Sequence, residues 1–222
     1  MASKLIVIEG LDGSGKGTQS KLVTQTLIDR GFKVRKLTFP DYDSPSSSLV
    51  KMYLGGELGD SPDDVNAYAA SSFYAVDRVA SYLKDWKNYY EQCDYIVADR
   101  YVTSNLIYQM TKVADSERDD FISWLEDFEY NRLMVPKPDI VIYLDVPPAI
   151  SQKLMTGRYN GDESKKDIHE KNMGFLNDCR KSALYALEKS GWIKLSCAID
   201  DKMKSIESIT EQILDIIDTN LK

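Results

Sequence analysis

Short apolar runs alternate with longer stretches of helical periodicity along the whole chain. A run of about four to eight apolar residues bounded by polar or turn residues fits a buried strand. The pattern predicts five strands, at about residues 5–8, 34–39, 95–98, 140–144 and 192–195. Because parallel strands need long crossover connections, the alternation favours a parallel sheet with helices on both faces. We therefore expect an α/β fold with a five-stranded parallel sheet.

Four stretches between and after these strands predict helices. The first covers about residues 15–30 and ends at Gly31, a residue that commonly terminates helices. The second covers about residues 62–90. The third is marked by apolar residues at helical spacing that we assign to the core, and the fourth is a closing amphipathic helix. Their marker residues are Phe121, Trp124, Leu125 and Phe128 for the third, and Ile206, Ile209, Ile213 and Ile217 for the fourth.

Composition narrows the class of protein. A chain of 222 residues suits one domain, which we place at residues 1–222. The net charge of -7 argues against binding along nucleic acid or an anionic membrane. Three cysteines without metal-ligand spacing and a single histidine, His169, leave little for metal-site or Cys/His catalytic chemistry. With neither a signal-peptide pattern nor an apolar stretch of about 20 residues, we expect a cytoplasmic protein.

A glycine-rich loop follows the first predicted strand and leads into the first predicted helix. Glycines let its N–H groups turn inward, and the positive end of the helix adds to the field, so the loop can hold phosphate. Lys16 would reach the outer phosphates of a nucleoside triphosphate. Gly17 occupies the usual Ser or Thr position, so either Thr18 supplies the hydroxyl for magnesium or the loop is a nucleotide-kinase variant. The loop comprises Gly10, Leu11, Asp12, Gly13, Ser14, Gly15, Lys16, Gly17 and Thr18.

Polar side chains follow the first three predicted strands, at the edge where open parallel sheets bind ligands. Asp12 lies after the first strand, Pro40-Asp41 after the second, and Asp99-Arg100 after the third. A carboxylate ending a strand suits magnesium, and an arginine suits phosphate through its two-pronged donors. An isolated Asp-Arg pair would be read as a structural ion pair. Repetition at three strand ends favours a ligand site.

The segment from Thr156 to Lys166 is polar and contains glycines, Arg158, Lys165 and Lys166. It follows the predicted strand that ends near Asp145. Two interpretations stay open, a solvated surface loop and a mobile lid over the phosphates. The lid would cover about residues 153–167.

Several motifs occur in a fixed order along the chain. They are Glu9 with the glycine-rich loop, Phe39-Pro40, Tyr74 to Arg78, Asp99-Arg100-Tyr101 with Ser104, Tyr108 and Gln109, and the polar segment before Asp167 to Glu170. This ordered set resembles the thymidylate kinase family of P-loop nucleoside monophosphate kinases. The resemblance extends from about Lys4 to the C-terminal helix. No single motif except the loop is specific. The ordered set is specific, because adenylate and guanylate kinases share the loop without the Asp-Arg-Tyr segment or a pair like Tyr74 and Arg78.

The resemblance implies phosphoryl transfer from ATP to dTMP with Mg²⁺ as cofactor, in a homodimer. It also implies a role for each matching residue. Tyr74 would stack on thymine, although a helix-core role is the alternative. Arg78 would donate to a thymine carbonyl, Asn105 would read the base edge, and Tyr108 would lie beside the sugar C2'. The acceptor-binding set is Asp12, Phe39, Pro40, Tyr42, Tyr74, Arg78, Arg100, Ser104, Asn105, Tyr108 and Gln109; the catalytic set is Asp12, Lys16, Arg100 and Arg158; the metal pair is Thr18 and Asp99.

The sequence departs from the family pattern at two positions. Gly13 stands where some members carry arginine, so we expect the transition-state cation to come from the lid, with Arg158 preferred and Lys153 as the alternative. Asp41 stands where members often carry arginine, and Lys51 is a weakly supported substitute. Two rival functions remain: a kinase for another nucleoside monophosphate or a deoxynucleoside, and a nucleotide-binding module without phosphoryl transfer. The non-catalytic module is disfavoured because the chain keeps the charged residues that phosphoryl transfer needs, Asp12, Lys16, Asp99 and Arg100.

Overall fold

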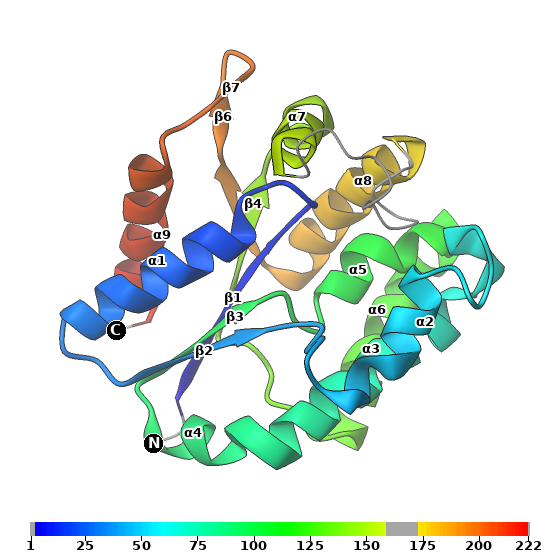
Figure 1. Ribbon diagram of the computed structural model, residues 1–222, viewed down its shortest axis with the longest axis horizontal. Coiled ribbons are helices and arrows are strands. Elements are labelled where there is room, and N and C mark those ends of the chain that lie inside the picture. Colours follow the sequence, from blue (N-terminus) through cyan, green and yellow to red (C-terminus); the bar gives the residue numbers. More distant parts are fainter. Residues whose placement is uncertain (1–2, 159–172, 222) are drawn as a thin grey trace.

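The computed structural model describes residues 3–158 and 173–221. Its centre is a sheet of five parallel strands in the order β2-β3-β1-β4-β5 (Figure 1). The strands are β1 (Lys4–Gly10), β2 (Val34–Thr38), β3 (Tyr95–Asp99), β4 (Ile140–Asp145) and β5 (Ile193–Ser196). All five predicted strands and their parallel pairing are confirmed. A short antiparallel hairpin, β6 (Ala198–Ile199) and β7 (Lys202–Met203), follows β5 and was not predicted.

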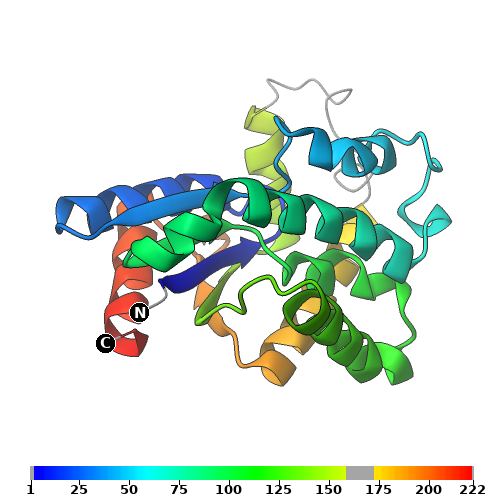
Figure 2. The ribbon, with the colours of Figure 1, turned by 90° about the horizontal axis from the view of Figure 1, so that it is seen from below.

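Helices cover both faces of the sheet. On one face lie α1 (Lys16–Asp29) and α9 (Ile206–Asn220), drawn in blue and red in Figure 1. The other face carries α3 (Ala67–Ser81), α5 (Ser104–Tyr108), α6 (Arg118–Glu126) and α8 (Met173–Ser190), as the turned view in Figure 2 also shows. The remaining α-helices of the described chain are α2 (Ser48–Leu54), α4 (Lys87–Gln92) and α7 (Pro148–Arg158).

The alternation of side chains along β1 explains why the central strands of the sheet are largely apolar. Leu5 and Val7 enter the core under α3, α5 and α8, whereas Ile6 and Ile8 enter the core under α1 and α9. A strand buried on both faces has no solvent side on which to place polar residues. Lys4 is exposed at the start of the strand, and Glu9, the next polar residue along it, is buried.

The long helix predicted at about residues 62–90 is divided in the structure. Pro62–Asp64 form only a 3-10 turn (η2), and α3 begins later because the Asn66 side chain accepts a hydrogen bond from the Ala69 amide and caps the helix there. A π-helical turn, η3 (Tyr82–Trp86), then joins α3 to α4 and buries the Trp86 ring completely. The π-helical segment η6 (Asp127–Arg132) continues α6 in the same way.

Three single turns complete the described helical segments: η1 (Pro45–Ser47), η4 (Met110–Lys112) and η5 (Asp115–Glu117). Within residues 3–158 and 173–221, no helix combines the length and apolar character needed to cross a bilayer. The three cysteines are free thiols.

Candidate active site

A cleft of about 840 Å³ opens at the carboxyl ends of β1 and β3. It is lined by the glycine-rich loop from Asp12 to Thr18, by Asp99, and by every residue of the predicted acceptor-binding set. Gly10 and Leu11 lie behind this surface, at the end of β1. The acceptor-binding residues that the cleft brings together are Asp12, Phe39, Pro40, Tyr42, Tyr74, Arg78, Arg100, Ser104, Asn105, Tyr108 and Gln109.

The glycine-rich loop has the shape that phosphate binding needs. Gly10 has φ +154°, and a Cβ there would lie 2.6 Å from Ser14 Oγ and 3.0 Å from the Leu144 carbonyl oxygen, so no other residue fits. Helix α1 starts after Gly15 without a side-chain cap and without an acidic residue in its first turn. Its first N–H groups therefore stay open to an anion.

Lys16 is held inside this loop and is only 6% exposed. Its Nζ donates to the Leu11 carbonyl oxygen at 2.8 Å and lies 3.9 Å from Asp12 Oδ1. Burial, followed by the nearby charge of Arg100, lowers the pKa of Lys16 to about 8. An incoming phosphate would add negative charge beside this ammonium group and oppose the effect of burial.

Asp12, Arg100 and Tyr108 form a second polar cluster beside the loop. Arg100 pairs with Asp12 Oδ1, and the Tyr108 hydroxyl donates to Asp12 Oδ2 at 3.0 Å. The guanidinium carbon also lies 5.1 Å from the centre of the Tyr108 ring. Arg100 has φ +67°, a costly conformation for a residue with a side chain, and such residues concentrate at functional sites.

Glu9 ties the end of β1 to the segment that follows β3. Its buried carboxylate accepts hydrogen bonds from the Tyr101 amide at 3.1 Å, from Thr103 Oγ1 at 2.8 Å and from Ser104 Oγ at 2.9 Å. Burial raises the pKa of Glu9, while the charge of Arg100 and these hydroxyl donors oppose the rise. Glu9 thus positions the start of α5, which carries three of the predicted acceptor-binding residues.

At the far side of the cleft, Arg78 from α3 meets Glu129 from η6. Arg78 Nε donates to Glu129 Oε2 at 2.7 Å, and Nη2 donates to Oε1 at 2.5 Å. The two side chains are 2% and 0% exposed. Asn105 Nδ2 donates to the same Oε1 at 3.3 Å. Burial lowers the pKa of Arg78, but the charge and hydrogen bonds of Glu129 outweigh it, so the pKa is raised.

Two oxygen groups near the loop suit a magnesium ion. Thr18 is exposed to the cleft and Asp99 lines it at the end of β3. A Cβ at Gly17 would lie 3.2 Å from Asp99 Oδ2, so a larger residue there would crowd this carboxylate. No group of three or more acidic, histidine or cysteine side chains within the described part of the chain is arranged to hold a metal. Magnesium that arrives with a nucleotide needs only one or two carboxylates besides the phosphates, and these residues fit that requirement.

Known proteins are similar to this chain over most of its length. The family model described as thymidylate kinase matches residues 8–213. The chain belongs to the thymidylate kinase family. Thymidylate kinase from Mycobacterium tuberculosis is 31% identical over 191 residues, covering 85% of this chain and 87% of that protein. A probable thymidylate kinase from Thermococcus kodakarensis is 32% identical over 219 residues, covering 97% and 98%.

A solved thymidylate kinase structure supports the fold. The structure of thymidylate kinase from Candida albicans superimposes with a TM-score of 0.69 at 22% identity, covering 99% of this chain and 92% of that chain. The predicted five-stranded parallel fold of the nucleotide-kinase type is therefore confirmed.

Two of the three predicted cationic residues lie away from the cleft lining. Lys153 on α7 and Lys51 on α2 are exposed, and neither lines the cleft. Arg158 is the last residue of α7, and its side chain lies outside the described structure, as do residues 159–167 of the predicted lid. The choice between Arg158 and Lys153 therefore stays a prediction.

Sequence reasoning missed one end of the cleft. Met203, Lys204 and Ile206, from the β6-β7 hairpin and the start of α9, line the cleft beside the P-loop helix. Gln19 on α1 joins them and donates to the Ile206 carbonyl oxygen at 3.1 Å. Ile206 is exposed, although it was assigned to the apolar stripe of the last helix. The rule that ligands bind beyond strand ends would have found these residues if applied to β5 as well.

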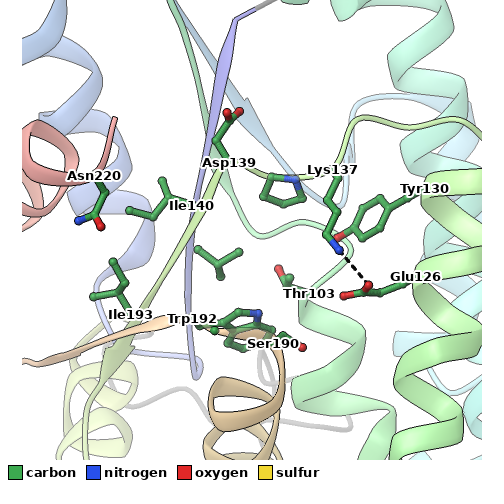
Figure 3. Close-up of a pocket in the computed structure, with 13 residues that line it drawn as sticks. Thr103, Glu126, Tyr130, Lys137, Asp139, Ile140, Ser190, Trp192, Ile193 and Asn220 are labelled. Atoms are coloured by element: carbon green, nitrogen blue, oxygen red, sulfur yellow. Dashed lines mark hydrogen bonds and ion pairs between the residues drawn. The ribbon is translucent and has the colours of Figure 1, made fainter. Parts of the chain in front are cut away.

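A second cavity of about 230 Å³ lies elsewhere (Figure 3). It is bounded by the start of β4, the end of α8 and η6, and the ion pair between Lys137 and Glu126 spans one side at 2.9 Å. Tyr130 and Trp192 add aromatic walls. None of the predicted phosphate-binding or acceptor-binding residues borders it, so the larger cleft is the candidate active site.

Proposed function

We propose that the protein transfers the γ-phosphoryl group of ATP to dTMP and releases ADP and dTDP. One observation carries this proposal: a single cleft is lined by a P-loop, by the ion pair of Asp12 and Arg100, and by the buried side chains Arg78 and Asn105. The P-loop suits a triphosphate, and the two buried side chains suit the polar edge of a base. Membership of the thymidylate kinase family supports the same assignment.

The reaction needs no protein nucleophile. The phosphate of dTMP is already an oxyanion at neutral pH, so no side chain has to remove a proton from it. The chain's task is to hold two anionic groups in line and to neutralise charge on the oxygens in flight. Lys16 serves the donor phosphates, Arg100 serves the acceptor phosphate, and Arg158 serves the transferring group.

Asp12 and Tyr108 hold Arg100 before the acceptor arrives. Asp12 accepts from both the guanidinium group and the Tyr108 hydroxyl, so the side chain of Arg100 is restrained at the cleft wall. A guanidinium group that is already oriented loses less entropy when it meets a phosphate. Tyr108 would also stand beside the sugar C2' and favour a deoxynucleotide.

Mg²⁺ would be held by Asp99 and Thr18 together with the nucleotide. When bound, the ion neutralises phosphate charge during transfer.

Tyr74 would supply the stacking surface for thymine, and stacking of a base on an aromatic ring is worth about 1–3 kcal/mol. The hairpin residues beyond the P-loop would border the donor nucleotide.

The proposal includes a homodimer and a cytoplasmic location. The homodimer rests on the resemblance to the family, and the location rests on the sequence pattern alone. Val76 and Leu83, which are exposed apolar residues of α3 and η3, offer a surface for self-association. Light scattering on the purified chain tests the dimer, and a monomer at micromolar concentration would contradict it.

The decisive test is ADP production with each nucleoside monophosphate in turn. dTMP should be the best acceptor, and dUMP should be weaker because it lacks the methyl group. A missing methyl costs about 1–3 kcal/mol, so we expect about 10- to 200-fold discrimination. Higher activity with AMP or GMP, or with nucleosides, would replace dTMP as the substrate. Tight ATP binding without any transfer would favour a regulatory module.

A further inference from the structure

Glu129 is the residue through which the base-reading side chains are joined. Its carboxylate receives Nε and Nη2 of Arg78 on two oxygens and Nδ2 of Asn105 on one of them. Arg78 and Asn105 both line the cleft, whereas Glu129 lies behind them and is fully buried. Three separate segments, α3, α5 and η6, therefore meet at one carboxylate.

The chemistry of this contact determines which way the Asn105 amide points. A carboxylate paired with arginine offers only acceptors, so Asn105 can approach it only with its NH₂ group. Its carbonyl oxygen is then the group left for the cleft. Arg78 has only donors, and its guanidinium group is held in one orientation by the two-pronged contact. The cleft thus presents a donor from Arg78 beside an acceptor from Asn105.

We propose that Glu129 is the positioning residue that determines base specificity, because it imposes this donor-acceptor order on Arg78 and Asn105. The inference rests on the proposed function, in which the acceptor base occupies this part of the cleft. This order matches a pyrimidine that carries a 4-oxo group and N3–H. The 4-oxo group accepts from Arg78, and N3–H donates to Asn105. A 4-amino pyrimidine presents a donor next to an acceptor, so both of its groups meet the wrong partner.

The size of the effect follows from burial. Sites built to hydrogen-bond a substrate reject an analogue that leaves their buried groups unpaired by about 10⁴- to 10⁵-fold. Because Glu129 and Arg78 are almost fully buried, water cannot take over the lost contacts. A mismatch at two adjacent groups should therefore be rejected strongly, although the two bases have nearly the same shape.

The matched pair of acceptors is dTMP and 5-methyl-dCMP, which share the sugar, phosphate and 5-methyl group and differ only at positions 3 and 4. For the wild-type protein, kcat/KM should favour dTMP by at least about 10³-fold. Glu129→Gln keeps the shape of the side chain but replaces one acceptor with a donor. Asn105 can then turn its oxygen toward Gln and present NH₂ to the cleft.

In Glu129→Gln, the ratio of kcat/KM for dTMP over 5-methyl-dCMP should fall by at least about tenfold, with the KM for ATP unchanged. A purely structural role for Glu129 predicts equal losses for both acceptors, so an unchanged ratio would overturn the inference. Glu126→Gln is the control, because Glu126 lies three residues earlier and pairs with Lys137 at the other cavity (Figure 3). It should leave the ratio as in the wild type.

Asn105→Ala keeps the inference testable if Glu129→Gln does not fold, since it leaves the Arg78–Glu129 pair intact. Loss of the amide acceptor should lower the same ratio at least about tenfold, and an unaltered ratio would refute the inference. Wild-type activity separates this outcome from failure of the proposed function. If the wild type does not phosphorylate dTMP, the proposed function fails; if it does and the variants keep the ratio, only the role of Glu129 fails.

Discussion

The two ends of the cleft, which we propose to hold the phosphates and the base and call the phosphate end and the base end, differ in how far their charged side chains are exposed. At the phosphate end, Asp12 and Arg100 stand on loops after β1 and β3, and each side chain is 20% exposed. At the base end, Arg78 and Glu129 come from helical segments and are 2% and 0% exposed. Lys16, also at the phosphate end, is buried but has a carbonyl oxygen as its nearest partner. Both ends hold an ion pair, but the pair at the phosphate end is partly exposed and can meet a further charged group, whereas the pair at the base end is sealed by burial.

This difference separates catalysis from stability. Breaking a buried ion pair leaves an uncompensated charge and costs about 3–5 kcal/mol, whereas partly exposed pairs contribute about 1 kcal/mol or less. Substitutions at the phosphate end should therefore change turnover more than folding. Substitutions at the base end should change acceptor affinity and folding together.

Lys16→Ala is the strongest test of the phosphate end. Removing the ammonium group withdraws charge stabilisation from the donor phosphates, and we expect turnover to fall by at least about 10³-fold. The melting temperature should stay within about 4 °C, as for a change of about 1 kcal/mol in a chain of this size. Steady-state kinetics and calorimetry measure both. Lys21→Ala, an exposed lysine on the same helix, is the control. Activity within a few-fold of wild type in Lys16→Ala would refute the P-loop role.

Arg158→Ala tests whether the lid supplies the cation for the transferring phosphoryl group. Gly13 cannot supply this charge, and a transition-state arginine is worth about 10³-fold or more in turnover. We expect a loss of about that size, with dTMP affinity by calorimetry almost unchanged. Lys153→Ala, on the same helix, is the matched comparison. Normal turnover in Arg158→Ala combined with its loss in Lys153→Ala would move the role to Lys153.

The phosphate end could be predicted from the sequence because its residues are local. The loop from Gly10 to Thr18 and the pair Asp99-Arg100 each follow an apolar run directly, and parallel strands bring their carboxyl ends to one edge. The central strands β1, β3 and β4 were predictable because burial on both faces makes them largely apolar, whereas the edge strands β2 and β5 each also carry an interior lysine. Membership of the family could be inferred because these motifs keep their order.

The base end depends on contacts between distant segments, which the sequence does not display. Glu129 lies 51 residues from Arg78 and 24 from Asn105. In the sequence, only the position of Glu129 indicates its role. It follows Leu125 by four residues and so lies on the apolar stripe of that helix, where an acidic side chain needs a buried partner. The start of α3 at Ala67 was likewise missed, because the Asn66 cap outweighs the helical pattern before it. The hairpin after β5 is too short to produce an alternating pattern.

Arg78→Ala distinguishes the base end from the phosphate end. The substitution removes a charged donor from the acceptor site, which costs about 1.5–3 kcal/mol, so the KM for dTMP should rise about tenfold or more. It also leaves Glu129 buried without its partner, and unfolding free energy should fall by about 3–5 kcal/mol. The KM for ATP should stay near normal. Equal losses for both nucleotides would indicate that Arg78 only supports the fold.

Arg35→Ala provides the reference for stability in this experiment. Arg35 pairs with Asp85 at 2.7 Å, but both side chains are exposed. Loss of such a pair should cost about 1 kcal/mol or less. If Arg35→Ala and Arg78→Ala lowered the unfolding free energy equally, burial would not be what separates the two ends of the cleft.

The smallest effect comes from the titration of Lys16. Its pKa of about 8 in the free protein means that about half of the molecules lose this charge at pH 8 and about nine-tenths at pH 9. Bound phosphate stabilises the protonated form and raises the pKa, so ATP binding should take up a proton in this range. ATP affinity should then fall about fivefold from pH 8 to pH 9, while dTMP affinity at the base end changes less. Calorimetry in buffers of different ionisation enthalpy measures the proton uptake, and Lys16→Ala should abolish it. Proton release, or uptake that persists in the variant, would mean that another group at the phosphate end titrates.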